Sequence, residues 1–125
     1  MDKLNQYREA IKKILTDYSK IKPSFGDIDR YTSFDLENDH YQIISVGWEE
    51  HRRVYGCLIH IDIINDKIWI QYDGTEYGVA NELTDVGIPK FDIVLAFHTP
   101  FMRQYSDFAV GWFMGNRESG IGNRE

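Results

Sequence analysis

Hydrophobic residues recur at steps of three and four positions near the start of the chain. The residues in this pattern are Leu4, Tyr7, Ile11, Ile14, Leu15 and Tyr18. Such spacing places them on one face of an α-helix, so we expect a helix over Lys3–Ser19. Asp2 is a suitable N-cap for this helix. The helix is expected to end before Pro23, because Lys22, as the residue preceding proline, avoids helical backbone angles.

Alternating hydrophobic and polar positions follow, interrupted by short polar turns, which is the pattern of half-buried strands. The expected strands cover residues 30–36, 41–48, 53–64 and 67–72. Polar turns at Glu37–Asp39, Glu49–Arg52 and Asn65–Asp66 join them. The last turn suits a tight hairpin, because Asn and Asp tolerate positive φ. Short connections make neighbouring strands antiparallel, so the pattern predicts a four-stranded antiparallel meander.

The alternation also predicts which side chains share a face of the sheet. In the second strand one face holds Ile44, Val46 and Trp48, and the other holds Ile43. In the third strand one face holds Tyr55, Cys57, Ile59, Ile61 and Ile63, and the other holds His60 and Asp62. In the fourth strand one face holds Ile68, Ile70 and Tyr72, and the other holds Trp69 and Gln71. We expect the N-terminal helix to cover one of these faces.

The second half of the chain predicts two further elements. A short helix is expected over Tyr77–Val86, with Thr75 as its cap and Gly87 in a left-handed conformation after its end. The continuous apolar run Ile93–Phe97 indicates a buried strand or core segment. Thr99-Pro100 then has the form of an N-cap followed by proline at the first position of a helical turn. The fold class is therefore α+β: an N-terminal helix packed on a four-stranded antiparallel meander, then a short helix and a short buried strand.

The length of 125 residues suits a single domain. We expect this domain over residues 1–112 and a flexible tail over residues 113–125. The single Cys57 excludes an internal disulfide and a multi-cysteine zinc site. The first ten residues contain no apolar signal region, and no apolar run reaches the length of a membrane span. These features predict a cytoplasmic protein without membrane contact.

The net charge of −6 disfavours direct DNA binding, because affinity for nucleic acids depends on neutralising phosphates with a basic patch. An acidic surface is more compatible with a basic protein partner. Direct DNA binding by the isolated chain stays open as an alternative.

Carboxylates near the third and fourth strands suggest a metal-dependent enzyme acting on nucleic acid as a second alternative. Asp62, Asp66, Asp73 and Glu76 are expected near one end of these strands, where His98 could join them. Two or three carboxylates can hold Mg²⁺ for phosphodiester cleavage. Their spacing matches no metal motif, and carboxylates are common in turns. We therefore favour solvated turn residues and expect no metal, no cofactor and no catalytic residue. His40 and His51 are expected in surface turns.

A partner-binding surface is predicted around the end of the apolar run. His98, Arg103 and Tyr105 follow this buried segment, and Arg and Tyr are enriched at interaction hot spots. Together with Asp73 and Glu76 they form the predicted surface. Local capping or salt-bridge contacts of His98 and Arg103 are an equally weighted alternative.

Four stretches of the chain resemble the XisI family, the fdxN element excision controlling factors found mostly in cyanobacteria. They are HIDIINDKIWIQ (60–71), DGTE (73–76), GIPKFDIVLAFHTP (87–100) and RQYSDFAV (103–110). The likeness covers roughly residues 1–110, and the chain departs from it at Gly111. The resemblance implies an accessory role in site-specific DNA excision during heterocyst development, together with a XisH-like partner. It supplies no catalytic residues, and it implies that DNA is reached only indirectly. The aromatic content is also compatible with a homo-oligomer.

Overall fold

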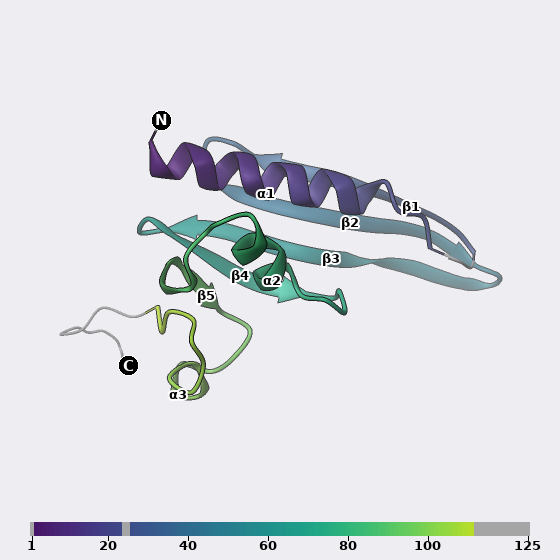
Figure 1. The fold of residues 1–125 in the computed structure, drawn as a ribbon. Coiled ribbons are helices and arrows are strands. Elements are labelled where there is room, and N and C mark those ends of the chain that lie inside the picture. The colour runs from purple at the N-terminus through teal and green to yellow at the C-terminus, as the bar shows by residue number, and fades with distance from the viewer. Residues whose placement is uncertain (1, 24–25, 112–125) are drawn as a thin grey trace.

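The structure is a computed structural model that describes residues 2–23 and 26–111, and the predicted tail over 113–125 lies outside these residues. Figure 1 shows the helices and strands of the fold. In chain order they are α1 (Lys3–Ser19), β1 (Asp27–Asp35), β2 (His40–Glu49), β3 (Arg52–Ile64), β4 (Lys67–Asp73), α2 (Val79–Asp85), the 3-10 turn η1 (Lys90–Asp92), β5 (Ile93–Leu95) and α3 (Pro100–Arg103). None of the helices in the described ranges is long and apolar enough to cross a membrane.

The five strands form one sheet in the order β1-β2-β3-β4-β5. The first four strands pair antiparallel, which confirms the predicted meander and the α+β class. Within the predicted buried run Ile93–Phe97, only Ile93–Leu95 form a strand, which pairs parallel to β4 with Ile68 opposite Ile93. The prediction was wrong at Phe97, which is 48% exposed. A parallel pair needs a crossover connection, and the segment containing α2 supplies it.

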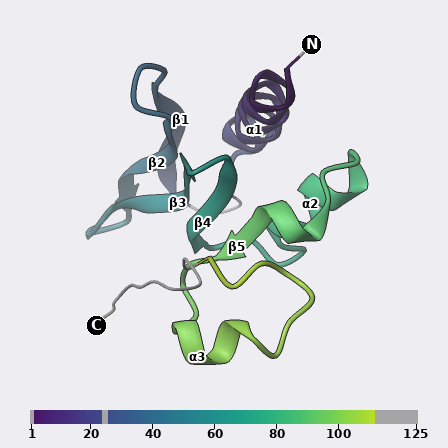
Figure 2. The ribbon, with the colours of Figure 1, turned by 90° about the vertical axis from the view of Figure 1, so that its left-hand side faces the viewer.

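Helices lie on both sides of the sheet. Figure 2 shows α1 and α2 on one side of the sheet and α3 on the other side. The helix-covered face contains the core, in which helix residues pack on alternate strand residues. Its largest fully buried side chains are Ile11, Leu15, Tyr41, Ile43, Ile59, Ile61, Ile68, Ile70, Leu83 and Ile93. We call the opposite side of the sheet the far face.

Two β-bulges change the predicted alternation of side chains. In the β2–β3 pair, Ile43 lies opposite Ile59 but Ile44 lies opposite Cys57, so Leu58 is an extra residue. In the β3–β4 pair, His60 lies opposite Tyr72 but Ile61 lies opposite Ile70, so Gln71 is extra. An added residue inverts the faces of the strand beyond it.

The predicted faces were therefore wrong at three positions. Tyr55 and Cys57 lie on the far face instead of beside Ile59, because the Leu58 bulge separates them from it. Tyr72 lies on the far face instead of beside Ile70, because the second bulge precedes it. Both corrections move polar or aromatic groups out of the core and onto the far face.

Helix ends agree with most of the capping predictions. The Asp2 side chain accepts the N–H of Leu4 at 2.8 Å, as expected for the cap of α1. Gly87 has a φ of 102°, and Thr99 caps α3. The prediction for α2 was wrong at its start: Thr75 does not cap the helix. A carboxylate oxygen of Asp73 instead accepts the N–H of Val79 at 2.7 Å.

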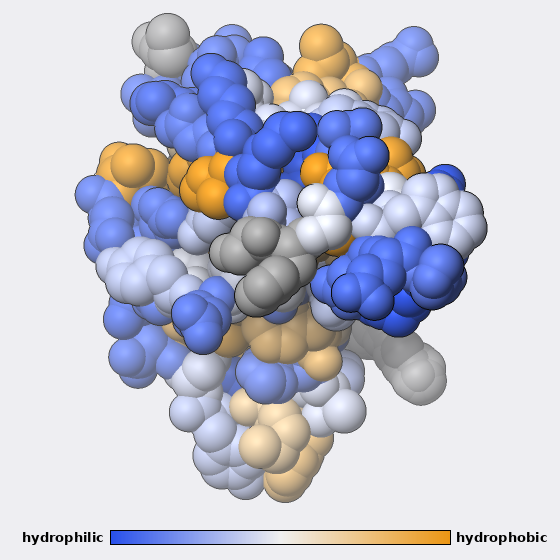
Figure 3. All heavy atoms as spheres, turned by 90° about the vertical axis from the view of Figure 1, so that its right-hand side faces the viewer, coloured by the Kyte–Doolittle hydropathy of each residue, from blue (hydrophilic) through white to orange (hydrophobic). Residues whose placement is uncertain are grey.

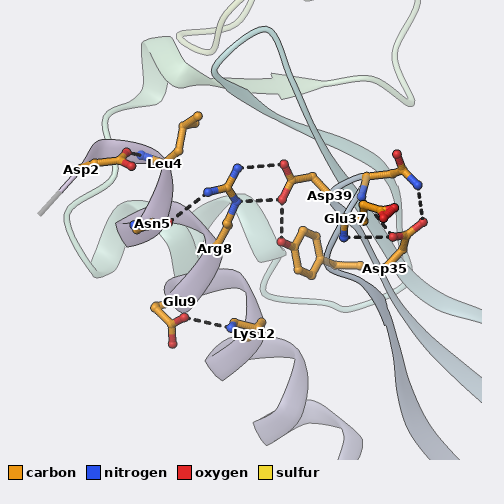
Figure 4. A network of polar contacts seen from close by, with 11 residues as sticks. Asp2, Leu4, Asn5, Arg8, Glu9, Lys12, Asp35, Glu37 and Asp39 are labelled. Atoms are coloured by element: carbon orange, nitrogen blue, oxygen red, sulfur yellow. Dashed lines mark hydrogen bonds and ion pairs between the residues drawn. The ribbon is translucent and has the colours of Figure 1, made fainter.

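A polar network holds α1 to the β1–β2 hairpin. Figure 4 shows Arg8 reaching from α1 to the carboxylate of Asp39, where its Nε and a terminal nitrogen bind one oxygen each at 2.9 and 3.1 Å. The hydroxyl of Tyr41 donates to the same carboxylate at 2.8 Å. The hydrogen bond from Arg8 lowers the pKa of Asp39, although partial burial opposes it. The first two turns of α1 are thereby fixed over the hairpin.

Candidate functional site

The residues of the predicted partner-binding surface come from two separate segments. Asp73 ends β4 and Glu76 lies in the connection between β4 and α2, whereas His98, Arg103 and Tyr105 lie in the segment after β5. The Asp73 carboxylate is engaged inside its own turn, where it also accepts the N–H and hydroxyl of Thr75. Glu76 is exposed. Asp73 therefore shapes the turn that presents Glu76.

Arg103 is the anchor of the segment after β5. Its guanidinium donates to the backbone carbonyls of His98, Val110 and Ala96 at 3.0, 3.2 and 3.3 Å. The same group lies 5.5 Å from the ring centre of Trp69 on the far face of the sheet. Arg103 thus makes the local contacts that were the alternative to direct partner binding, and it ties this segment to β4.

The segment held by Arg103 presents hydrophobic side chains to solvent. We use the name 97–105 loop for residues 97–105, which include the single helical turn α3. Its large exposed side chains are Phe97, Phe101, Met102 and Tyr105. The ring centres of Phe97 and His98 are 4.6 Å apart, and the ring centres of Phe101 and Tyr105 are 5.5 Å apart. Exposed aromatic groups on an anchored loop form a surface suited to protein binding, because little conformational entropy is lost when they are buried.

Replacing Arg103 with alanine is expected to release the 97–105 loop. The change removes three hydrogen bonds and the contact with Trp69, so we expect a loss of about 1–2 kcal/mol in the free energy of unfolding. Limited proteolysis with chymotrypsin, which cleaves after aromatic residues, should proceed faster at this loop. Gln104→Ala is the matched control, because that side chain makes one exposed hydrogen bond to the carbonyl of Phe101. Equal cleavage rates in the two variants would contradict the anchoring role of Arg103.

The far face carries a second group of exposed aromatic side chains. They are Tyr31, Trp48, Tyr55 and Tyr72. Figure 3 views the end of the molecule at which α1 finishes and β2 joins β3, and there hydrophobic residues form separate patches between hydrophilic ones. Isolated apolar groups are ordinary on protein surfaces. The 97–105 loop is the better candidate, because its apolar side chains are close together in sequence and share one anchor.

The carboxylates expected to share a metal site lie apart. Asp66 is in the β3–β4 turn and Asp73 is the last residue of β4, so the length of that strand separates them by roughly 20 Å. Asp62 pairs with Trp69 on the far face, whereas Asp73 pairs with Ile59 on the helix-covered face. The acidic cluster predicted for a metal-dependent enzyme is therefore not assembled.

A different cluster on the far face was missed in the sequence. His40, expected in a turn, is the first residue of β2 and pairs directly with Asp62 of β3. Its Nδ1 lies 2.7 Å from one carboxylate oxygen of Asp62, and the Nε2 of His60 lies 2.9 Å from the same oxygen. The hydrogen bond with Asp62 raises the pKa of His40. The predicted shared face of His60 and Asp62 was a signal for this cluster, but only the hairpin register adds His40.

Comparisons with known proteins identify relatives over almost the whole described chain. A family model described as XisI protein matches residues 1–110. The crystal structure of a XisI-like protein from Anabaena variabilis is similar, with a TM-score of 0.80 and 42% sequence identity, and the match covers 86% of this chain and 99% of that one. The structure of the fdxN element excision controlling factor XisI from the same organism has a TM-score of 0.76 and 33% identity, covering 88% and 100%. A search of the curated proteins found no match.

Proposed function

Because the chain belongs to the XisI family, we propose that it is a non-enzymatic accessory protein that acts with a XisH-like partner in the excision of a DNA element. The observation that carries this proposal is the likeness of the whole domain to a protein described as an excision controlling factor. A controlling factor modulates the activity of another protein, so binding to that protein is the primary property to test.

The 97–105 loop is the proposed contact with the partner. In it His98 and Tyr105 would touch the partner, and Arg103 would hold the loop in place. Tyrosine is favourable at such a position because it buries a large area while losing few rotatable bonds. Glu76 and the net charge of −6 favour a partner whose facing surface is basic. Asp73 contributes indirectly through the shape of its turn.

Two alternatives have less support from the arrangement of side chains. A metal-dependent enzyme using Asp62, Asp73, Glu76 and His98 would need these groups to converge, and Asp62 and Asp73 lie on opposite faces of the sheet. Direct DNA binding would need a cationic surface, and the chain carries 20 acidic against 14 basic residues. A basic partner that itself holds DNA reconciles an acidic accessory protein with a role in excision.

The test is a binding titration of the purified chain with the XisH-like protein encoded by the same organism. We expect a complex of fixed ratio, and we expect Tyr105→Ala to weaken it by about tenfold or more. Tyr55→Ala is the matched control, since Tyr55 is 74% exposed and Tyr105 is 69% exposed, but Tyr55 lies on the far face. Light scattering of the free chain measures whether it is also a homo-oligomer, as the aromatic content suggested.

The outcomes separate the two parts of the proposal. The absence of any complex would contradict the proposed accessory role with a XisH-like partner. A complex that Tyr105→Ala leaves intact and Tyr55→Ala weakens would keep the accessory role and move the interface to the far face. Both variants change exposed side chains, so loss of the fold is not a competing explanation.

A further inference from the structure

We propose that His40, His60 and Asp62 form a binding site for a divalent transition-metal ion such as Zn²⁺. Each residue offers one ligand atom, and these three atoms lie within 4.8 Å of one another. Two imidazole nitrogens and one carboxylate oxygen are a donor set that Zn²⁺ accepts, with a further coordination position left for water or a partner group. The site is independent of the partner contact proposed for the 97–105 loop.

The sheet, not a flexible loop, positions the three ligands. His40 and Asp62 are direct cross-strand partners in the antiparallel β2–β3 pair. His60 precedes Asp62 by two residues on the same strand and therefore points to the same face. Backbone hydrogen bonds of the central strands hold all three Cα atoms in place, so the ligands are preorganised before an ion arrives.

Only small side-chain movements separate the observed positions of the three ligand atoms from those of a coordinated ion. Zn²⁺ binds nitrogen and oxygen ligands at about 2.0–2.2 Å, which places tetrahedral ligand atoms about 3.4 Å from one another. The two histidine nitrogens lie 2.7 and 2.9 Å from the shared oxygen of Asp62. Side-chain rotations that open these contacts by less than about 1 Å therefore admit an ion.

The surroundings of Asp62 favour a bound cation. The residue is 7% exposed, and a buried carboxylate is costly without a compensating charge. Within residues 2–23 and 26–111, the two histidines are the only positively chargeable groups that pair with it. Gln71 donates to the second oxygen of the carboxylate at 3.1 Å, an outer contact that orients the first oxygen toward the histidines. The side chain of His40 is 51% exposed, which gives an ion a path to the site.

The test is a titration of the metal-free full chain with Zn²⁺ in competition with a chromophoric chelator. We expect one Zn²⁺ per chain and a rise in melting temperature as Zn²⁺ is added. Gln71→Ala should lower the affinity by about 10–100-fold, and His40→Gln, His60→Gln or Asp62→Asn should lower it further. His51→Gln is the matched control, because His51 is an exposed histidine in the β2–β3 turn, and it should bind as the wild type does.

The result that overturns the proposal is a wild-type chain without stoichiometric Zn²⁺ binding, or a His51→Gln variant that loses as much affinity as His40→Gln. Asp62→Asn changes a buried residue and could disturb the sheet, so its fold is checked by circular dichroism without Zn²⁺. His40→Gln changes a half-exposed side chain at the start of β2. If the Asp62 variant is unfolded, the Zn²⁺ affinity of His40→Gln tests the proposed site in its place.

Discussion

Replacing Asp92 with alanine is expected to lower the free energy of unfolding by about 2–3 kcal/mol, measured by urea denaturation. Asp92 is 3% exposed, and its carboxylate joins three distant parts of the chain. One oxygen accepts the hydroxyl of Tyr7 and pairs with Lys3 of α1 at 3.3 Å, and the other pairs with Lys67 of β4 at 3.4 Å. Without the carboxylate, the buried hydroxyl of Tyr7 and two cations lose their common acceptor.

The control for Asp92 is Asp107→Ala, which removes a carboxylate from an exposed pair with Lys90. That change should cost less than about 1 kcal/mol, because exposed ion pairs contribute little. A loss for Asp92→Ala no larger than this would contradict the role of the buried carboxylate in joining α1, β4 and η1.

The same carboxylate predicts a pH dependence. Burial alone would raise the pKa of Asp92, but hydrogen bonds from Tyr7 and Lys3 outweigh it and hold the pKa below its usual value. A lowered pKa in the folded state stabilises the fold above the unfolded pKa of about 3.9, and this stabilisation disappears as the pH falls through the folded value. The advantage of the wild type over Asp92→Asn should therefore shrink below about pH 4.

Local chemistry explains which parts of the fold could be predicted from the sequence. The helix α1 has the predicted bounds because a strong three-and-four periodicity lies between a capping Asp2 and Pro23. Strand ends were predicted to within about three residues because polar turns mark them; Asn65 and Asp66 indeed have positive φ. Such signals act over a few residues, so a single sequence displays them.

Features that depend on pairing between distant residues could not be predicted in this way. The extra positions at Leu58 and Gln71 become visible only when two strands are aligned, and each bulge inverts the faces beyond it. The parallel pairing of β5 with β4 likewise depends on how α2 crosses the sheet. Periodicity reports whether a residue is buried, but not which strand lies beside it.

In the candidate sites, too, features set by local sequence could be predicted, and features set by contacts between distant residues could not. The exposed loop around His98 and Tyr105 follows from residue type and from the buried segment before it. The anchoring of that loop by Arg103 does not, because its carbonyl partners span residues 96–110 and its aromatic partner Trp69 is on another strand. His40 joins His60 and Asp62 only through the register of a hairpin, so a sequence with no alignment gives no reason to group it with them.

Replacing Gly47 with alanine is expected to lower the free energy of unfolding by about 3 kcal/mol, the upper end for a side chain forced into a packed site. Gly47 lies in β2 directly opposite Ile28 of β1. A Cβ atom at this position would lie 2.1 Å from the carbonyl oxygen of Asp27 and 2.6 Å from the Cα of Ile28. Both obstacles are backbone atoms, so the clash cannot be relieved by a side-chain rotation. The pairing of β1 with β2 must shift.

Gly56→Ala is the matched control for this prediction. Gly56 lies in β3 opposite Ser45 of the same sheet, and a Cβ built there meets no other heavy atom within 4 Å. Because glycine is less favourable than alanine in a strand by about 0.5–1 kcal/mol, this variant should be as stable as the wild type or slightly more stable. Because both variants add a methyl group, the difference between their free energies of unfolding measures the steric cost of that group at Gly47. Thermal or urea unfolding gives both values. If Gly47→Ala unfolds at the same denaturant concentration as Gly56→Ala, then β1 and β2 do not approach as closely as described, and the register that places β1 at the edge of the sheet must be revised.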